Sequence, residues 1–250
     1  MNLNNTIKLH QPCVTDKSNT GKAKSSGFGW SSGNWSGYAI TGKKGAFQRI
    51  SGEWRVPYVR PTSKSTYSSA WIGIDGFKNS SLIQTGTGHE YVNGNARYYA
   101  WWEILPAAET VIRQTVCPGD LMRASIVKVS RCKWSITISN LSRKWTFRTL
   151  QSYSGPQASA EWIMEAPQID GSIAKLARVS PTYFNRCRIN GRSPKLTPSK
   201  GGIMIQNYVT LAVPSYPNAN GDAFVVKRLY SKMPPLVYSR SPILISPNHK

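Results

Sequence analysis

Alternation of apolar and polar residues runs through most of this chain and predicts short β-strands. The segment 134–141 alternates with period two, which is typical of a strand with one buried face. The preceding run, 121–129, is expected to be its antiparallel partner across a short basic connection. Helical periodicity is nearly absent, and only residues 173–178 favour a helical turn.

Further strand candidates recur along the body of the chain, separated by Gly, Pro, Asn and Ser. They cover residues 52–56, 68–75, 82–85, 97–105, 145–150, 160–165, 182–187, 203–213 and 223–228. Many short strands joined by turn residues predict an all-β protein built as an antiparallel β-sandwich. We expect this domain to span residues 30–229, between a flexible N-terminal arm (1–29) and a Pro-rich C-terminal extension (230–250).

The charge of the chain is strongly one-sided. Among 250 residues, 32 Lys and Arg face 11 Asp and Glu, which gives a formal net charge of +21. The basic residues are scattered rather than clustered among aromatic residues, which favours a solvated basic surface over a nucleic-acid reader. Weak attraction to polyanions at low salt stays open as an alternative. No apolar run is long enough for a membrane span, and residues 1–29 show no signal-peptide pattern.

The chain has few Cys and His residues that could bind a metal or take part in nucleophilic catalysis. The four cysteines lack CxxC spacing, which argues against a zinc site and leaves one or two disulfides open. His10 and His249 fall in the tails, so a Ser-His-Asp or Cys-His site would have to use His89. His89 lies in a stretch of loop-like composition (85–95), which favours an exposed turn histidine. We therefore expect no metal and no cofactor.

Carboxylates in aromatic-rich strands are the residues that could carry acid–base chemistry. Alternation places Trp71 and Asp75 on one face of their strand, and Trp101 and Glu103 on one face of another. Burial beside aromatic rings shifts the pKa of such carboxyl groups. Any one of these residues alone could equally be a hydrogen-bonded strand residue.

Two further glutamates, Glu161 and Glu165, share a face of one strand. Four strand residues separate them by roughly 13 Å, so they cannot share a proton without a bulge. Each would need a partner from another strand. Gln84, at a strand end and followed by Thr85 and Gly86, offers a polar amide for that role.

Seven short motifs follow one another along residues 34–165. They are Asn34-Trp-Ser-Gly-Tyr38, Gly52-Glu-Trp-Arg-Val-Pro57, Trp71-Ile-Gly-Ile-Asp-Gly76, Ile83-Gln-Thr-Gly86, Ala100-Trp-Trp-Glu103, Pro118-Gly-Asp120 and Ala160-Glu-Trp-Ile-Met-Glu165. In this order and with this spacing, the set resembles the glutamic peptidase, or eqolisin, family. A weaker likeness continues to about residue 229. A single motif would be a weak signal, but the ordered set is specific.

The resemblance implies a concanavalin-like sandwich of two curved antiparallel sheets, with a Gln and a Glu as the catalytic dyad. These positions fall on Gln84 and Glu165, with Glu161 as the fallback if the register of that motif is shifted. The family positions with supporting roles around the cleft fall on Trp71, Asp75, Trp101 and Glu103.

The implied activity is that of an acid-acting endopeptidase, which needs no cofactor, cleaves protein or peptide substrates and acts outside the cell. We expect a monomer. This sequence departs from the family at Trp102, where a Tyr usually stands, and in its +21 charge, since well-known fungal members are acidic. An alternative from another class is a catalytically inactive sandwich that binds polysaccharide or peptide in an aromatic groove. Trp71, Trp101 and Trp102 would then act as stacking platforms.

Overall fold

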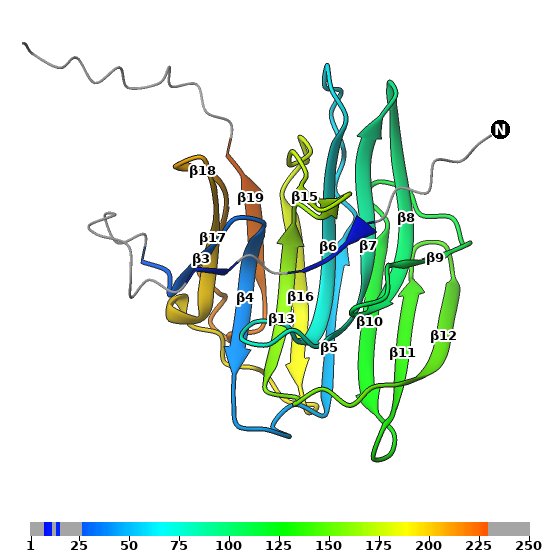
Figure 1. Ribbon diagram of the computed structural model, residues 1–250, viewed down its shortest axis with the longest axis vertical. Helices are drawn as coiled ribbons and strands as arrows, with labels where there is room; N and C mark the ends of the chain where they lie inside the picture. The colour runs from blue at the N-terminus through cyan, green and yellow to red at the C-terminus, as the bar shows by residue number, and fades with distance from the viewer. Residues whose placement is uncertain (1–7, 12–13, 16–26, 230–250) are drawn as a thin grey trace, which may run out of the picture.

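The computed structural model describes residues 8–11, 14–15 and 27–229, and these form an almost purely β structure (Figure 1). The strands are β1 (Lys8–Leu9), β2 (Val14–Thr15), β3 (Trp30–Ser32), β4 (Trp35–Thr41), β5 (Arg49–Arg55), β6 (Thr66–Asp75), β7 (Leu82–Val92), β8 (Asn95–Ile104), β9 (Thr110–Ile112), β10 (Leu121–Lys128), β11 (Lys133–Asn140), β12 (Trp145–Ser152), β13 (Ser159–Glu165), β14 (Gln168–Ile169), β15 (Ser172–Ile173), β16 (Thr182–Ile189), β17 (Gly201–Gln206), β18 (Val209–Pro214) and β19 (Phe224–Arg228). A short 3-10 helix, η2, spans Pro198–Lys200. Most of the predicted arm 1–29 and the whole of 230–250 lie outside the described residues.

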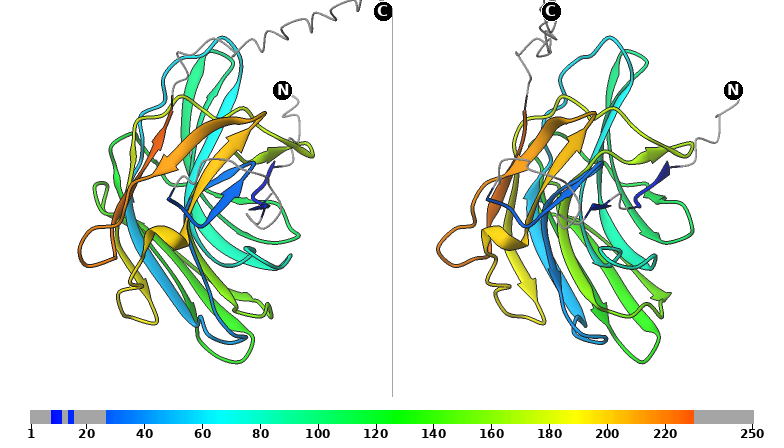
Figure 2. Two further views of the ribbon diagram at one scale, coloured as in Figure 1. Left: turned by 90° about the vertical axis from the view of Figure 1, so that its left-hand side faces the viewer. Right: turned by 60° about the vertical axis from the view of Figure 1, so that its left-hand side comes forward.

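Most strands belong to one hydrogen-bonded path that folds back on itself into two facing layers. The first layer has the order β12-β11-β10-β5-β16-β19, and the second has the order β4-β13-β6-β7-β8-β9. β18 and β17 join the two layers along the same path. Figure 2 shows that both layers are curved. The predicted antiparallel sandwich is therefore confirmed.

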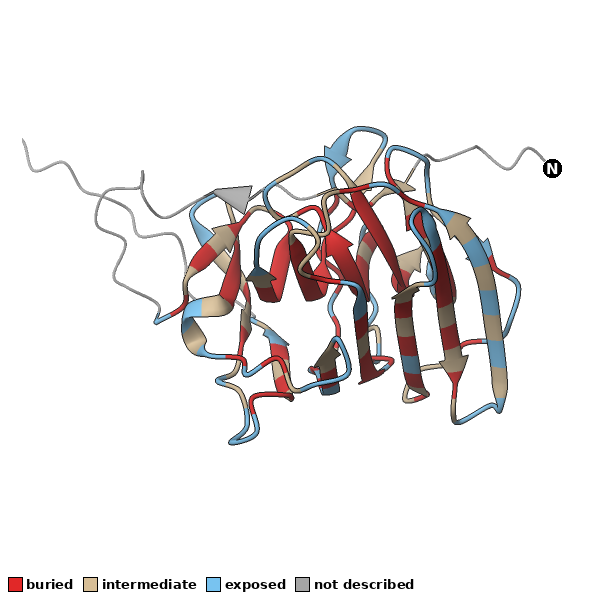
Figure 3. Ribbon diagram, turned by 90° about the horizontal axis from the view of Figure 1, so that it is seen from below, coloured by how far each residue is buried: buried red, intermediate tan, exposed pale blue. Residues whose placement is uncertain are grey.

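The main core lies between the layers and is built from alternate residues of each strand. In β6, Ile72 and Ile74 point into this core. Trp54 of β5 crosses it, and its Nε1 donates a hydrogen bond to Thr87 Oγ1 of β7 at 2.9 Å. Figure 3 shows that the central strands are buried along most of their length, so they are covered on both faces. The face of β4, β13, β6, β7 and β8 that points away from the core is called the site face below.

Two local predictions have clear outcomes. The hairpin of residues 121–129 and 134–141 is confirmed as β10 and β11, which pair Ala124 with Ile138. The helical turn at 173–178 is wrong. Lys175 O accepts a hydrogen bond from Tyr67 N and Ala177 N donates one to Tyr67 O, so contact with the start of β6 holds this segment extended.

The expectation for His89 is also wrong, because residues 85–92 belong to β7 and His89 is buried. Its Nε2 lies 2.8 Å from Thr87 Oγ1, and its Nδ1 lies 3.4 Å from Ser68 Oγ. Burial lowers the pKa of His89 to about 3, so the ring is neutral. The polar residues that suggested a loop instead form hydrogen bonds with one another inside the sandwich.

The cysteines form no disulfide within the described part of the chain. Cys117, Cys132 and Cys187 are free thiols, and Cys13 lies outside the described residues. No three His, Cys, Asp or Glu side chains of residues 8–11, 14–15 and 27–229 gather in a way that could hold a metal ion. None of the helical structure in these residues is long and apolar enough to cross a bilayer.

Candidate active site

Two of the residues singled out by the sequence, Gln84 and Glu165, come from strands on either side of β6. Gln84 lies in β7 opposite Gly73 of β6, and Glu165 ends β13 opposite Ser69 of the same strand. Both side chains lie on the site face. With residues 8–11 in place, neither side chain has any exposed surface.

The Glu165 carboxylate is held by donors to both of its oxygens. Trp71 Nε1 donates to Oε2 at 2.7 Å, and Asn34 Nδ2 donates to Oε1 at 3.1 Å. The Trp71 ring is packed edge-on against Trp35, with ring centroids 4.8 Å apart. These contacts fix where the carboxylate points.

The Gln84 amide is oriented by its neighbour in β8. Its Nε2 donates to Oε2 of Glu103, the residue directly opposite in the β7–β8 pairing. The same Nε2 donates to the backbone carbonyl of His10 at 3.2 Å. Among the described residues, Gln84 Oε1 has no hydrogen-bond partner.

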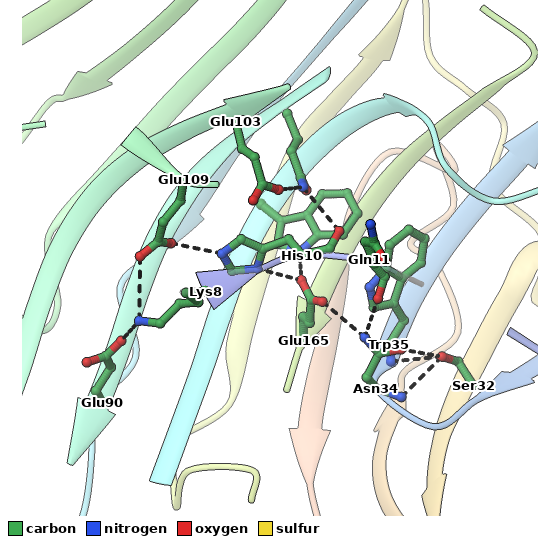
Figure 4. A network of polar contacts seen from close by, with 12 residues as sticks. Lys8, His10, Gln11, Ser32, Asn34, Trp35, Glu90, Glu103, Glu109 and Glu165 are labelled. Carbon is green, nitrogen blue, oxygen red and sulfur yellow. Dashed lines mark hydrogen bonds and ion pairs between the residues drawn. The ribbon is translucent and has the colours of Figure 1, made fainter. Parts of the chain in front are cut away.

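Residues 8–11 lie across the site face as an extended peptide (Figure 4). Lys8 and Leu9 form β1, which pairs antiparallel with Gln168 and Ile169 of β14. In Figure 1 this segment runs across β6 and β7 rather than along them. Gln11 O accepts a hydrogen bond from Asn34 Nδ2 at 2.6 Å.

His10 is the point at which this peptide meets the site. Its Nδ1 lies 2.8 Å from Glu165 Oε2, and its Nε2 lies 2.9 Å from Glu109 Oε2. Its ring stacks on Trp101, with centroids 4.0 Å apart and planes 3° from parallel. Burial alone would lower the pKa of His10, but the charge of Glu165 and the hydrogen bonds from Glu109 and Glu165 raise it to about 10.

The pKa values of the two other carboxyl groups near His10, those of Glu103 and Glu109, are shifted in opposite directions. Burial raises the pKa of Glu103 to about 7, and the neighbouring Glu165 adds to this although His10 opposes it. Burial would also raise the pKa of Glu109, but its hydrogen bond to His10 and the charge of Lys8 lower it below the ordinary value. Near pH 6, Glu103 is therefore mostly protonated while Glu109 is ionised.

Other predicted residues divide between the two faces of the second layer. Trp71 and Trp101 lie on the site face, as the alternation predicts, and belong to its aromatic cluster. Trp102 packs against the main core on the opposite face. It therefore cannot share a groove with the other two rings. Glu161 is fully buried, and burial raises its pKa well above the ordinary value.

Asp75 does not join the cluster around His10. It ends β6 with a φ of 73° and accepts hydrogen bonds at its two carboxylate oxygens. Oδ2 accepts from Tyr153 OH at 2.6 Å and from Gln157 N at 2.8 Å, and Oδ1 accepts from Ala158 N at 2.8 Å. Asp75 therefore ties the end of β6 to the segment that leads into β13, the strand that carries Glu165.

We expect Asp75→Ala to lower the free energy of unfolding by about 3–5 kcal/mol, because it leaves one buried and two partly buried donors unpaired and puts alanine at a positive φ. Asp75→Asn keeps one acceptor oxygen and should cost less than half as much. Urea unfolding of the two variants measures the difference. Equal stability of wild type and Asp75→Ala would contradict this role.

Sequence reasoning missed several members of the site, namely Lys8, His10, Asn34 and Glu109. Asn34 belongs to a motif that was recognised, but its contact with Glu165 needs the pairing of β4 with β13. The residues from the N-terminal region carry no periodicity that would place them in a cleft. No sequence signal marked Glu109.

The sequence and the fold of this chain were compared with those of known proteins. The family model described as the Peptidase A4 family matches residues 33–225, which is most of the chain. The chain belongs to the Peptidase A4 family. This confirms the predicted resemblance to the glutamic peptidases, and membership implies peptidase activity.

The relatives of this Peptidase A4 member share its fold at modest identity. Aspergillopepsin-2 of Aspergillus niger is 25% identical over 200 residues, covering 69% of this chain and 70% of that protein. The structure of scytalido-glutamic peptidase with a transition state analog inhibitor matches with a TM-score of 0.68 and 22% identity, over 79% of this chain and 98% of that one. SCP-B, an eqolisin solved in a complex with the tripeptide Ala-Ile-His, matches with a TM-score of 0.62 and 22% identity over the same shares.

Proposed function

We propose that this Peptidase A4 member is an acid-acting endopeptidase in which Gln84 and Glu165 form the catalytic dyad. One observation carries the proposal. The carbonyl of His10, a residue in an extended peptide, accepts a hydrogen bond from Gln84 Nε2, while Glu165 lies within 2.8 Å of the same residue's side chain. Both members of the dyad therefore reach one residue of a bound peptide from two different strands.

The chemistry follows from these positions. When a substrate replaces residues 8–11, an ionised Glu165 accepts a proton from a water molecule, and that water attacks the peptide carbonyl carbon. Gln84 Nε2 donates to the carbonyl oxygen as it becomes an oxyanion, and Gln84 Oε1 is free to help hold the water. The C–N bond breaks as Glu165 passes its proton to the leaving nitrogen.

Glu103 gives a physical reason for an acidic working range. Its carboxyl faces Gln84 of β7, His10, Glu165 of β13 and Glu109. With its pKa raised to about 7, Glu103 is neutral below that pH. Above pH 7 an ionised Glu103 would repel both the ionised Glu165 and the developing oxyanion. We therefore propose Glu103 as a positioning residue that acts through Gln84.

The substrates in this proposal are proteins and peptides bound in extended form. SCP-B was solved in a complex with a tripeptide that ends in His, and Lys8-Leu9-His10 of this chain likewise ends in His, which supports a peptide as the ligand of this cleft. We propose that the enzyme acts outside the cell as a monomer. Asp75, Trp71 and Trp101 would support the dyad through the contacts described above.

Digestion of casein by the full chain between pH 2.5 and pH 7 tests the proposal. We expect fragments at acidic pH, little cleavage at neutral pH and no effect of pepstatin, which the glutamic peptidases are expected to resist. A groove-binding protein without activity would give no fragments at any pH. A rate plateau that extends through neutral pH would contradict the role given to Glu103.

A further inference from the structure

Four arginines that are far apart in the sequence share the outer face of the first layer, on the side of the sandwich opposite the site face. Arg49 lies in β5, Arg123 in β10, and Arg186 and Arg188 in β16. These strands are neighbours in the order β10-β5-β16 (Figure 1). The four side chains line a hollow of about 640 Å³, which Glu53 also lines. This hollow is called the arginine hollow below.

A β-bulge in β16 turns one of these arginines outward. Between Asn185 and Arg188 the register of β16 against β5 shifts, so that Arg186 and Cys187 together lie opposite one residue. Strict alternation would point Arg186 into the core, because the side chain of Phe184 is a core residue. Instead Cys187 is buried, and Arg186 is exposed with a φ of 49°, a backbone conformation that residues other than Gly rarely adopt. Bulges near functional sites often redirect a side chain in this way.

Two carboxylates orient the arginines but do not neutralise all of them. Glu53 Oε1 accepts a hydrogen bond from Arg123 Nε at 2.7 Å, and Arg186 Nη1 lies 3.7 Å from the same oxygen. Asp222 Oδ2 accepts a hydrogen bond from Arg188 Nη1. Two of the four positive charges remain after both carboxylates are counted. The side chains of Arg123 and Arg186 are 50% and 70% exposed, and each guanidinium has five N–H donors, so donors remain for a ligand.

The residues that line the arginine hollow favour one class of anion. Arginine presents a planar fork that binds two oxygens of one tetrahedral anion, such as a phosphate group. Among the described residues that line the hollow, none is aromatic, so no ring is available to stack on a nucleic-acid base. Ser51 and Ser125 lie directly opposite each other in the β5–β10 pairing and offer hydroxyl groups to a sugar. This combination favours an anionic polysaccharide over a nucleic acid.

We propose that the arginine hollow binds an acidic polysaccharide whose sugars carry sulfate or phosphate ester groups. The guanidinium forks hold the ester oxygens, and the two serines bind sugar hydroxyl groups. Because the hollow and the site face lie on opposite sides of the sandwich, a bound polymer leaves Gln84 and Glu165 accessible to a substrate. The proposal does not depend on peptidase activity, and it gives part of the +21 charge of the chain a partner.

Titration calorimetry of the full chain with dextran sulfate at physiological ionic strength tests the proposal, with neutral dextran as the control polymer. We expect Arg49→Gln combined with Arg186→Gln to raise the Kd for dextran sulfate by about tenfold or more, because charge-assisted hydrogen bonds are lost. Arg97→Gln combined with Arg113→Gln removes two exposed charges from the second layer instead, and should change this Kd by less than about twofold. Equal effects of the two double variants, or tighter binding of single-stranded DNA of equal charge, would overturn the proposal.

A second measurement uses the wild-type chain and therefore decides the inference even if a variant fails to fold. Phenylglyoxal modifies exposed guanidinium groups, and mass analysis of the resulting peptides gives the rate at each arginine. We expect dextran sulfate at about ten times its Kd to slow modification of Arg49 and Arg186 by about tenfold, and to leave Arg97 and Arg113 unaffected. Equal protection of all four arginines would indicate a polymer that coats the whole cationic surface. That result, or no protection of Arg49 and Arg186, would contradict a site in the arginine hollow.

Discussion

Replacing Glu165 with Gln should lower kcat for peptide cleavage by about 10²–10⁴-fold without unfolding the sandwich. The amide has nearly the same shape as the carboxylate, and its one oxygen can still accept a hydrogen bond from Trp71 or from Asn34, but it cannot accept a proton from water. Rates of peptide hydrolysis at the optimal pH, together with circular dichroism, measure the two parts of this expectation.

Glu161→Gln is the matched control, because Glu161 lies on the same strand and the same face. Its carboxyl is neutral through most of the acidic range, since burial raises its pKa, and an amide is a close substitute for a protonated acid. We expect this variant to keep near wild-type kcat. If Glu161→Gln abolished cleavage and Glu165→Gln did not, the dyad would have to be reassigned to Glu161.

Replacing His10 with Ala should raise the rate of peptide cleavage at pH 6 by about 30-fold or more over wild type. His10 contacts both Gln84 and Glu165, so a substrate can reach the dyad only after this residue leaves. Truncating one partner of a buried ion pair typically weakens binding by that much. The variant keeps both proposed catalytic side chains, so the gain reflects access alone.

The pH dependence of this contact follows from the groups that face His10, which are Glu165 of β13, Glu109 after β8 and Glu103 of β8. The pKa of His10 is raised from 6.5 to about 10, so its ion pairs contribute fully below pH 6.5 and are lost as the pH rises through 10. The pKa of Glu109 is lowered, so its contribution is present above pH 4.5 and is lost as the pH falls through that lowered value.

Residues 8–11 should therefore be bound firmly at pH 4.5–6.5 and loosen in stronger acid. The wild-type rate should begin to rise as the pH falls below about 4.5, whereas the rate of His10→Ala should extend to higher pH, because the variant lacks the ion pairs that hold residues 8–11. Profiles of kcat/KM against pH for the two proteins measure this shift. Superimposable profiles would show that His10 does not limit access.

The sequence predicted the parts of this protein that depend on local alternation. The placement of Trp71 on one face of its strand and of Trp101 on one face of another needs only the period of a β-strand, and both rings lie in the aromatic cluster of the site face. Strand β4 was missed, because its Gly37 and mixed polar residues interrupt any alternation. Its place is set by pairing with β13, which lies more than 100 residues later in the chain.

Residues of the candidate site could be predicted only where they belong to a motif that resembles the family. Gln84 and Glu165 were singled out by motif resemblance, but their geometry around His10 depends on strand order, which no short segment encodes. The wrong prediction for His89 has the same origin. Residues 85–95 have the composition of a loop, and the hydrogen-bond partners that let His89 lie buried, Ser68 and Thr87, are known only from the structure. Lys8 and Glu109 are brought together by contacts between residues about 100 positions apart.

A crystal structure of the full-chain His10→Ala variant with a peptide aldehyde tests the central claim most directly, because a hydrated aldehyde presents two hydroxyl groups on the carbon that water attacks. We expect one hydroxyl within about 2.6–3.2 Å of a Glu165 carboxylate oxygen and the other within that distance of Gln84 Nε2. A hydrated carbon that contacts neither side chain, or that is bound through Glu161 instead, would contradict the account.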